Sequence, residues 1–205
     1  LIAPFYDSIY EFDYMADRAI VEKDNKYGFV NKNGKVVIPV IYNDAFDFDG
    51  DYAIVKKEDK EGLIDLFGFV KLPFLYDELI SLAPNEFYCA KRNNKFGVIN
   101  CEGAVILPFE FDFRFHCKDY SRPYIFFVEE TGKEGNRIYT SQFNFLGYFD
   151  PDFVVSYMIT AEDGEAGFYV IRKHKHQNTN VLLSAKGEIL VDDFEEITGV
   201  YSEAL

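Results

Sequence analysis

The sequence has no tryptophan, only three cysteines and only three histidines among its 205 residues. Cys89, Cys101 and Cys117 are odd in number and lack paired spacing, which excludes a disulfide framework and a cysteine-based zinc ribbon. Long apolar runs are also missing, since nothing approaches the roughly eighteen consecutive residues that a transmembrane helix requires. No signal peptide is visible, but the chain begins with Leu1 instead of methionine, and a start removed by processing would look the same. A cytoplasmic and an exported location therefore both stay open.

Basic residues are scarce. The chain has 21 Lys and Arg against 35 Asp and Glu, which gives a net charge of −14. A field of this sign repels nucleic-acid phosphates and anionic membrane surfaces, so the sequence predicts no nucleic-acid partner and no membrane insertion. The one basic spot is RKHKHQNTN (172–180), a minor candidate for contact with an anionic partner. His174 and His176 would share a strand face there and could reach one metal ion, but we interpret the stretch as an exposed polar loop. We predict no metal site and no cofactor.

Aromatic residues are abundant instead, because 22 Phe and 15 Tyr bring the aromatic content to 18%. With 48% hydrophobic and 27% charged residues, the composition is typical of a globular protein. Phe and Tyr suit half-buried pleated surfaces, so this composition favours β structure.

An internal repeat of about 35 residues runs through the sequence. Pro4, Pro39, Pro73 and Pro108 lie 35, 34 and 35 residues apart, and each precedes an aromatic-acidic segment such as PFYDSI or PFLYDELI. Two series of glycines share the period, with an Asn or Asp three residues before the second glycine. In this pattern the Asn or Asp side chain caps a turn, and the glycines supply positive φ or close packing. The predicted structural turn positions are Gly28, Asn31, Gly34, Gly62, Asp65, Gly68, Gly97, Asn100 and Gly103.

Each unit consists of short strands joined by tight turns, which predicts an all-β fold with little helix. The last strand of each unit is expected to end at the proline, which cannot donate to a strand ladder. YDELI (76–80) could form one helical turn. The expected architecture is a tandem array of about five β-hairpin or meander repeats, with a five-bladed β-propeller as the alternative because closure would hide the edge strands. We expect a single domain over residues 1–205, with clear repeats at 4–38, 39–72 and 73–107 and degenerate repeats at 108–150 and 151–205. The degenerate repeats hold the looser copies NFLG (144–147) and SAKG (184–187).

The sequence resembles the WG-repeat proteins of bacteria in three segments: NKYGFVNKNGKVVIPVIYNDAF (25–46), DKEGLIDLFGFVKLPFLYDEL (59–79) and NKFGVINCEGAVILPFEFDF (94–113). That repeat unit runs roughly Gly-Lys-Trp-Gly, an apolar strand with Asp or Asn, a turn glycine, an apolar pair before proline, and an aromatic-Asp pair. Tyr27, Glu61 and Phe96 stand where the family has its tryptophan. The resemblance covers residues 1–113, implies a module that binds partners, and brings no catalytic residues.

The most motif-like stretch, YGFVNKNGKVVIP (27–39), is not a phosphate-binding loop. Five residues separate Gly28 from Gly34 where that motif has four, and Val36 stands where magnesium binding needs Ser or Thr. DFDGD (47–51) is interpreted as a solvated turn, because counting from Gly50 does not place the ligands of a calcium loop. No Ser-His-Asp or Cys-His pattern is present. We therefore predict that the chain is not an enzyme.

Aromatic and acidic residues recur together after the prolines. Stacked in an array they would form a ladder, which is either part of the core or the face of a partner-binding groove. The predicted function is a non-catalytic repeat module that mediates interaction with an unknown protein or peptide. A carbohydrate-binding module that uses the ladder on a glycan is the alternative, and a hydrolase with repeat-derived carboxylates is a third hypothesis. The proposed ladder residues are Tyr6, Asp7, Tyr42, Asp44, Tyr76, Asp77, Phe111 and Asp112.

Overall fold

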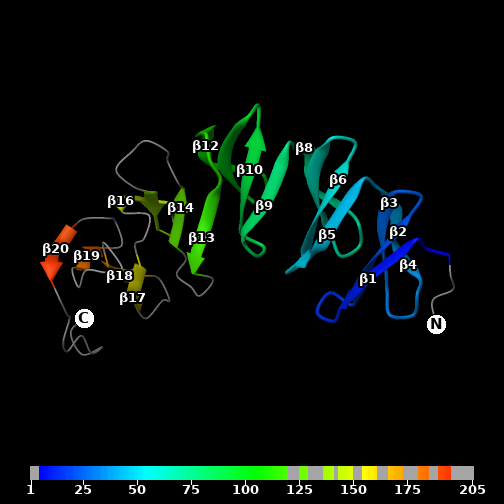
Figure 1. Cartoon of the computed structure of the whole chain (residues 1–205), viewed down its shortest axis with the longest axis horizontal. Coiled ribbons are helices and arrows are strands. Elements are labelled where there is room, and N and C mark those ends of the chain that lie inside the picture. The colour runs from blue at the N-terminus through cyan, green and yellow to red at the C-terminus, as the bar shows by residue number, and fades with distance from the viewer. Residues whose placement is uncertain are drawn as a thin grey trace. The chain divides into compact units, whose positions relative to one another are not determined.

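The computed structural model describes residues 5–119, 125–128, 136–140, 143–149, 154–160, 166–172, 180–184 and 189–194. Over these residues the chain is all-β, as predicted (Figure 1). None of them forms a helix that could cross a membrane. The strands make five four-stranded antiparallel sheets, and in each sheet a strand pairs with the next one along the chain. The predicted tandem array of β-meander repeats is thereby confirmed, with one sheet for each repeat.

The chain divides into two compact units, Leu1–Arg114 and Phe115–Leu205, where the sequence predicted one domain. The first unit contains the first sheet (β1–β4), the second sheet (β5–β8) and the third sheet (β9–β12). Their bounds are β1 (Ser8–Asp13), β2 (Arg18–Lys23), β3 (Lys26–Val30), β4 (Val36–Tyr42), β5 (Asp44–Asp49), β6 (Tyr52–Lys57), β7 (Lys60–Asp65), β8 (Val70–Tyr76), β9 (Glu78–Ala83), β10 (Phe87–Arg92), β11 (Lys95–Asn100) and β12 (Val105–Phe111). YDELI therefore enters strand β9 and does not form a helical turn.

The second unit contains the fourth and fifth sheets. Their strands are β13 (Phe115–Asp119), β14 (Ile125–Val128), β15 (Asn136–Tyr139), β16 (Phe145–Phe149), β17 (Val154–Thr160), β18 (Ala166–Arg172), β19 (Asn180–Ser184) and β20 (Ile189–Phe194). In the fourth sheet the rings of Phe126 and Phe143 stack 4.6 Å apart.

Pro39, Pro73 and Pro108 each lie inside the last strand of a sheet, so the prediction that this strand ends at the proline is wrong. Pro39 lies in the middle of β4, an edge strand in the order β1-β2-β3-β4. Tyr27 pairs with Tyr42 and Phe29 with Ile38, so residues 39–41 lie opposite a single residue, Gly28. Proline is tolerated at such a bulge in an edge strand, because the ladder does not require its missing N–H there. The second and third sheets repeat this register around Pro73 and Pro108.

The first glycine of each repeat is required by this bulge. A Cβ atom on Gly28 would lie 2.7 Å from both the Pro39 carbonyl oxygen and the Val40 Cα. Equivalent Cβ atoms on Gly62 and Gly97 would lie 2.8 Å from the carbonyl oxygens of Leu72 and Leu107 respectively. These glycines lie within β3, β7 and β11, so their assignment to turns is corrected to close packing within a sheet.

The second glycine of each repeat lies in the turn between the third and fourth strands. Gly34, Gly68 and Gly103 have φ angles of 76°, 85° and 84°, which favour glycine. Asn31 begins the first of these turns, and its Oδ1 accepts hydrogen bonds from the amides of Asn33 (3.0 Å) and Lys35 (3.1 Å). The side chain therefore takes the place of a backbone turn contact.

The fourth sheet uses different residues for the same turn. The Thr140 Oγ1 accepts from the Asn144 amide at 3.1 Å, and the Phe143 amide donates to the Thr140 carbonyl at 2.9 Å. Phe143 has a φ of 59° and takes the glycine position. The prediction of NFLG (144–147) as the turn copy of this repeat is therefore wrong. Phe143 holds the glycine position of the turn, and Gly147 belongs to β16. SAKG (184–187) lies largely outside the described residues.

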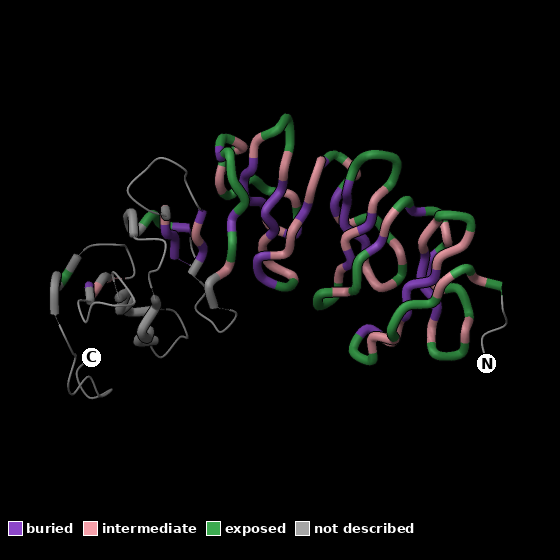
Figure 2. The backbone as a smooth tube through the Cα atoms, viewed as in Figure 1, coloured by how far each residue is buried: buried purple, intermediate pink, exposed green. Residues whose placement is uncertain are grey.

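Core side chains fill the space between consecutive sheets of the first unit. One cluster joins Ile20, Phe29 and Ile38 of the first sheet to Ala53 and Val55 of the second. A second cluster joins the second and third sheets and includes Leu63, Leu72, Tyr88 and Ile99. Figure 2 shows the buried residues along the middle of these strands and the exposed ones at the turns. Because both faces of the second sheet are covered, four consecutive residues of its inner strand β7, Glu61 to Ile64, are buried.

Replacing Gly28 with alanine is expected to lower the free energy of unfolding by about 2 kcal/mol, because the new Cβ would meet main-chain atoms that cannot rotate away. Urea denaturation followed by far-ultraviolet circular dichroism measures this change. Gly103→Ala is the control, since its Cβ meets only a Leu72 methyl group at 3.2 Å and its φ of 84° costs about 1 kcal/mol. Equal losses in the two variants would contradict the close-packing role.

Candidate functional site

The periodic aromatic residues of the proposed ladder belong to the core. Tyr42, Tyr76 and Phe111 are 4%, 6% and 6% exposed, and Tyr6 is half-buried. The ring of Tyr42 packs near Phe74 of the next sheet at 6.2 Å between centroids. The exposed aromatic ladder is therefore corrected to a set of core contacts, and the carbohydrate hypothesis loses the surface on which it depended.

The periodic aspartates support turns and ion pairs. The Asp7 Oδ2 accepts from the Asp24 amide at 2.7 Å, and this hydrogen bond is the main reason that the pKa of Asp7 is lowered. In the second sheet the equivalent residue is Asn43, whose Oδ1 accepts from the Glu58 amide at 2.8 Å. The prediction of Asp44 as the counterpart of Asp7 is therefore wrong by one residue, since Asn43 holds that position.

Two further ladder aspartates pair with lysines. Asp77 binds Lys60, which lowers the pKa of Asp77, and Asp112 binds Lys95. A glycoside hydrolase of the usual two-carboxylate type needs one carboxyl held protonated beside a second carboxylate. The two aspartates whose pKa values shift, Asp7 and Asp77, shift in the opposite direction.

A pocket of about 380 Å³ lies on the second sheet beside the β7–β8 turn. Phe67 and Phe69 of this turn are 73% and 71% exposed. The equivalent positions are Asn33 and Lys35 in the first repeat and Glu102 and Ala104 in the third. We call the pocket the second-sheet pocket; its lining residues are Asp51, Tyr52, Asp65, Leu66, Phe67, Phe69, Val70 and Lys71.

Asp65 fixes the two exposed phenylalanines. Its Oδ1 accepts hydrogen bonds from the amides of Phe67 and Phe69, both at 2.9 Å. From the first sheet, the Arg18 guanidinium donates to the Leu66 carbonyl at 3.0 Å. The turn that carries the two rings is therefore held from its own side chain and from the neighbouring sheet.

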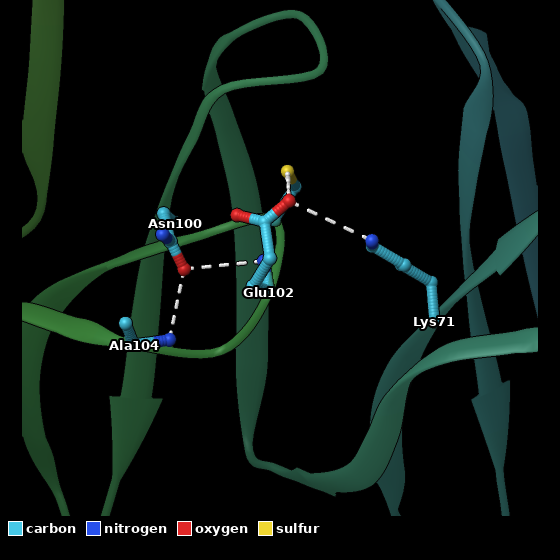
Figure 3. Close-up of polar contacts among 5 residues, drawn as sticks. Lys71, Asn100, Glu102 and Ala104 are labelled. Carbon is cyan, nitrogen blue, oxygen red and sulfur yellow. Dashed lines mark hydrogen bonds and ion pairs between the residues drawn. The ribbon is translucent and has the colours of Figure 1, made fainter.

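Lys71 forms the polar side of the pocket. Its Nζ lies 5.7 Å from the centre of the Tyr52 ring and 3.6 Å from the Glu102 Oε1 of the third sheet (Figure 3). Charge interactions with Tyr52 first, and then with Glu102, raise the pKa of Lys71. Asn100 holds the Glu102 turn by accepting from the amides of Glu102 (3.1 Å) and Ala104 (2.8 Å). The ammonium charge of Lys71 is thus balanced within the protein.

Asp51 is also positioned by the third sheet. Its amide donates to the Asn85 Oδ1 at 2.8 Å, and the Asn85 Nδ2 donates to the Asp51 Oδ2 at 3.1 Å. The Asn85 side chain that binds Asp51 is neutral, as are the backbone amides bound by Asp65. The rim of the second-sheet pocket therefore keeps two negative charges.

The Cys101 thiol, next to Glu102, is not an activated nucleophile. Burial and a 2.9 Å hydrogen bond from the Cys101 Sγ to the Glu102 Oε1 raise the pKa of this thiol. His116 is exposed and stacks on Phe127 at 5.2 Å, whereas His174 and His176 lie outside the described residues. Within the part of the chain that the structure describes, no group of three His, Cys, Asp or Glu side chains could hold a metal ion.

Comparison with known proteins finds a family that is similar to the first part of the chain. The family described as "WG containing repeat" matches residues 1–27 and 27–60. Residues 1–60 are therefore similar to the WG-repeat family, in agreement with the resemblance seen in the sequence. None of the curated proteins compared with the chain matches it.

Solved structures resemble the chain at low identity. A structure described as that of the eukaryotic initiation factor is 8% identical with a TM-score of 0.52, and the match covers 95% of this chain and 67% of that one. Hsv2p of Kluyveromyces lactis is 10% identical with a TM-score of 0.38, covering 92% and 66%. Such similar structures are β-propeller-like, and the likeness to the initiation factor shows the fold alone.

The sequence did not single out the second-sheet pocket. A signal was present, because two positions that are polar or small in the neighbouring repeats both carry phenylalanine in the second.

Replacing Asp65 with alanine is expected to lower the free energy of unfolding by about 1 kcal/mol, since two turn amides lose their acceptor. Asp65→Asn keeps an Oδ1 acceptor and should stay close to wild type. Urea denaturation checks both values. If Asp65→Asn lowered the free energy of unfolding as much as Asp65→Ala, the charge of Asp65 and not its turn hydrogen bonds would be responsible.

Cys101 is expected to alkylate with a pH midpoint above the value of about 8.5 typical of a free thiol. Iodoacetamide labelling followed by peptide mass spectrometry would measure this midpoint in the folded protein, with urea-unfolded protein as the reference. Glu102→Gln should lower the midpoint, because the carboxylate that disfavours the thiolate is removed. A wild-type midpoint below the unfolded reference would contradict this prediction.

Proposed function

We propose that the chain is a non-catalytic interaction module that binds an extended peptide segment of a partner protein at the second-sheet pocket. The observation that carries this proposal is the pair of exposed phenylalanines, Phe67 and Phe69, which line a pocket and whose backbone amides are bound by Asp65. Repeat arrays commonly bind partners through surfaces at which individual repeats diverge from the shared pattern.

The dimensions favour a peptide over a large flat partner. A volume of about 380 Å³ accommodates one or two side chains and lies at the lower end of small-ligand sites. Two aromatic rings beside such a pocket suit an apolar or aromatic anchor side chain. We therefore expect the bound segment to insert one such residue.

Charge indicates what flanks that anchor. The pocket rim keeps the charges of Asp51 and Asp65, and Lys71 is already paired with Glu102. The whole chain carries a net charge of −14, which attracts basic segments over long distances. The expected ligand is therefore an apolar residue with lysine or arginine close to it in the sequence.

A random peptide display library selected on the full chain provides the test, with synthetic peptides measured by fluorescence anisotropy. Phe67→Asn combined with Phe69→Lys installs the residues of the first repeat, and it should weaken binding at least about tenfold through loss of the aromatic anchors. Phe46→Asn is the matched control, because Phe46 is a 49% exposed phenylalanine of the same sheet outside the pocket. Raising the salt concentration should also weaken binding.

Three results would contradict the proposal. Selected peptides could bind the double variant as well as the wild type, or they could lack basic residues and show no salt dependence. In a parallel glycan array, glycans that bind the wild type and not the double variant would assign the pocket to carbohydrate instead.

A further inference from the structure

Glu61 is a carboxylic acid in the interior of the first unit. It is 9% exposed and occupies the position that carries Tyr27 in the first repeat and Phe96 in the third. In the register of the second sheet it lies opposite Lys56 of β6 and Tyr76 of β8. A group that ionises therefore stands where the neighbouring repeats have an aromatic ring.

Glu61 also joins two sheets. Its Oε2 accepts a hydrogen bond of 2.6 Å from the amide of Leu79, which belongs to β9 of the third sheet. At the first junction the equivalent amide, that of Ala45, donates to its own neighbour Asp44 at 2.9 Å. At the second junction, the acceptor for the Leu79 amide therefore comes from the preceding sheet. At the first junction, the acceptor for the Ala45 amide does not.

The surroundings make the charged form of Glu61 costly. Burial disfavours the carboxylate most, and the nearby acids Glu78 of β9 and Asp44 of β5 disfavour it further. The Leu79 amide and Lys56 favour it, but together they do not compensate, and the pKa of Glu61 is raised. Glu78 is itself paired with Arg114 at 2.7 Å, and Tyr76 opposite is kept neutral by burial, which raises its pKa.

We propose that Glu61 is a pH-dependent link between the second and third sheets, which holds the junction most firmly when it is protonated. The same two sheets also carry the Lys71–Glu102 and Asp51–Asn85 contacts at the other end of these strands, so Glu61 joins the two sheets at the end away from the second-sheet pocket. This inference concerns the fold and does not depend on what the pocket binds.

The direction of the effect follows from proton linkage. A carboxyl whose folded pKa is raised binds its proton more tightly in the folded state than in the unfolded state. Its contribution to stability is therefore largest below the unfolded value of about 4.3 and is lost as pH rises through the folded pKa. Asp7 and Asp77 act oppositely, because their lowered pKa values contribute stability that is lost only below about pH 3.9.

The test compares urea midpoints of the wild type and Glu61→Gln between about pH 4.5 and about pH 8. Glutamine keeps the acceptor for the Leu79 amide and cannot ionise. The wild-type midpoint should fall relative to that of Glu61→Gln as pH rises, and titrating groups that do not interact with Glu61 cancel in the difference. Glu110→Gln, a substitution of an exposed residue of β12, is the matched control. Its urea midpoint should change with pH in the same way as that of the wild type.

Amide hydrogen exchange locates the effect. The protection factor of Leu79 should decrease with pH in the wild type and stay constant in Glu61→Gln. A constant difference between the two midpoints would overturn the proposal. So would a direct carbon-13 titration of the wild-type Glu61 carboxyl that gave a value at or below about 4.3, a measurement that does not depend on any variant folding.

Discussion

The close approach of one glycine to the bulged last strand is the contact on which the rest of the first unit depends. At Gly28, Gly62 and Gly97 the backbone of the last strand crosses so near that no side chain fits. Three residues of the last strand lie opposite the glycine. The residues that flank the glycine in its own strand are again paired one to one with the last strand. Because the bulge spans an odd number of residues, Ile38 and Tyr42 on either side of it face the same core.

This geometry explains why the sequence predicted the fold well and the surfaces poorly. The spacing of Gly34, Gly68 and Gly103 after an Asn or Asp is a local signal, since the turn is closed by hydrogen bonds within five residues. The role of Gly28 is set by a strand eleven residues further along, and sequence spacing alone does not show that the two segments touch. The same limitation made Pro39 resemble a strand end.

For a related reason, the sequence leaves open whether the aromatic-acidic ladder lies in the core or on a partner-binding face. Periodicity identifies residues that share an environment in every repeat, but it does not distinguish a covered face from an open one. Stacking covers both faces of the second sheet, so Tyr42 and Tyr76 are in the core, and the aspartates that follow the tyrosines are left at turns. The error at Asp44 arose because Asn43 performs the same capping with an amide oxygen, which an alignment of aspartates overlooks.

Positions at which one repeat differs from its neighbours are more informative about function than positions that all repeats share. An array is stabilised by equivalent contacts in each unit, so a residue that every unit shares is explained by packing. Phe67 and Phe69 bury little of their surface and replace polar or small residues, so stability does not account for them. Glu61 replaces an aromatic ring in the core, where a carboxyl group is costlier than the ring.

Glu61, Lys71 and Asp51 contact the third sheet, and the polar contacts of this junction concern geometry more than stability. Ion pairs as exposed as Lys71–Glu102 contribute little free energy, because solvent screens them and both side chains lose freedom. They do select one arrangement of the two sheets over its neighbours, as do the paired hydrogen bonds between Asp51 and Asn85. An apolar interface alone tolerates small slips, since hydrophobic contact is non-directional. Directional contacts placed next to the second-sheet pocket therefore hold its rim in a fixed geometry, which lowers the ordering cost of any ligand that binds there.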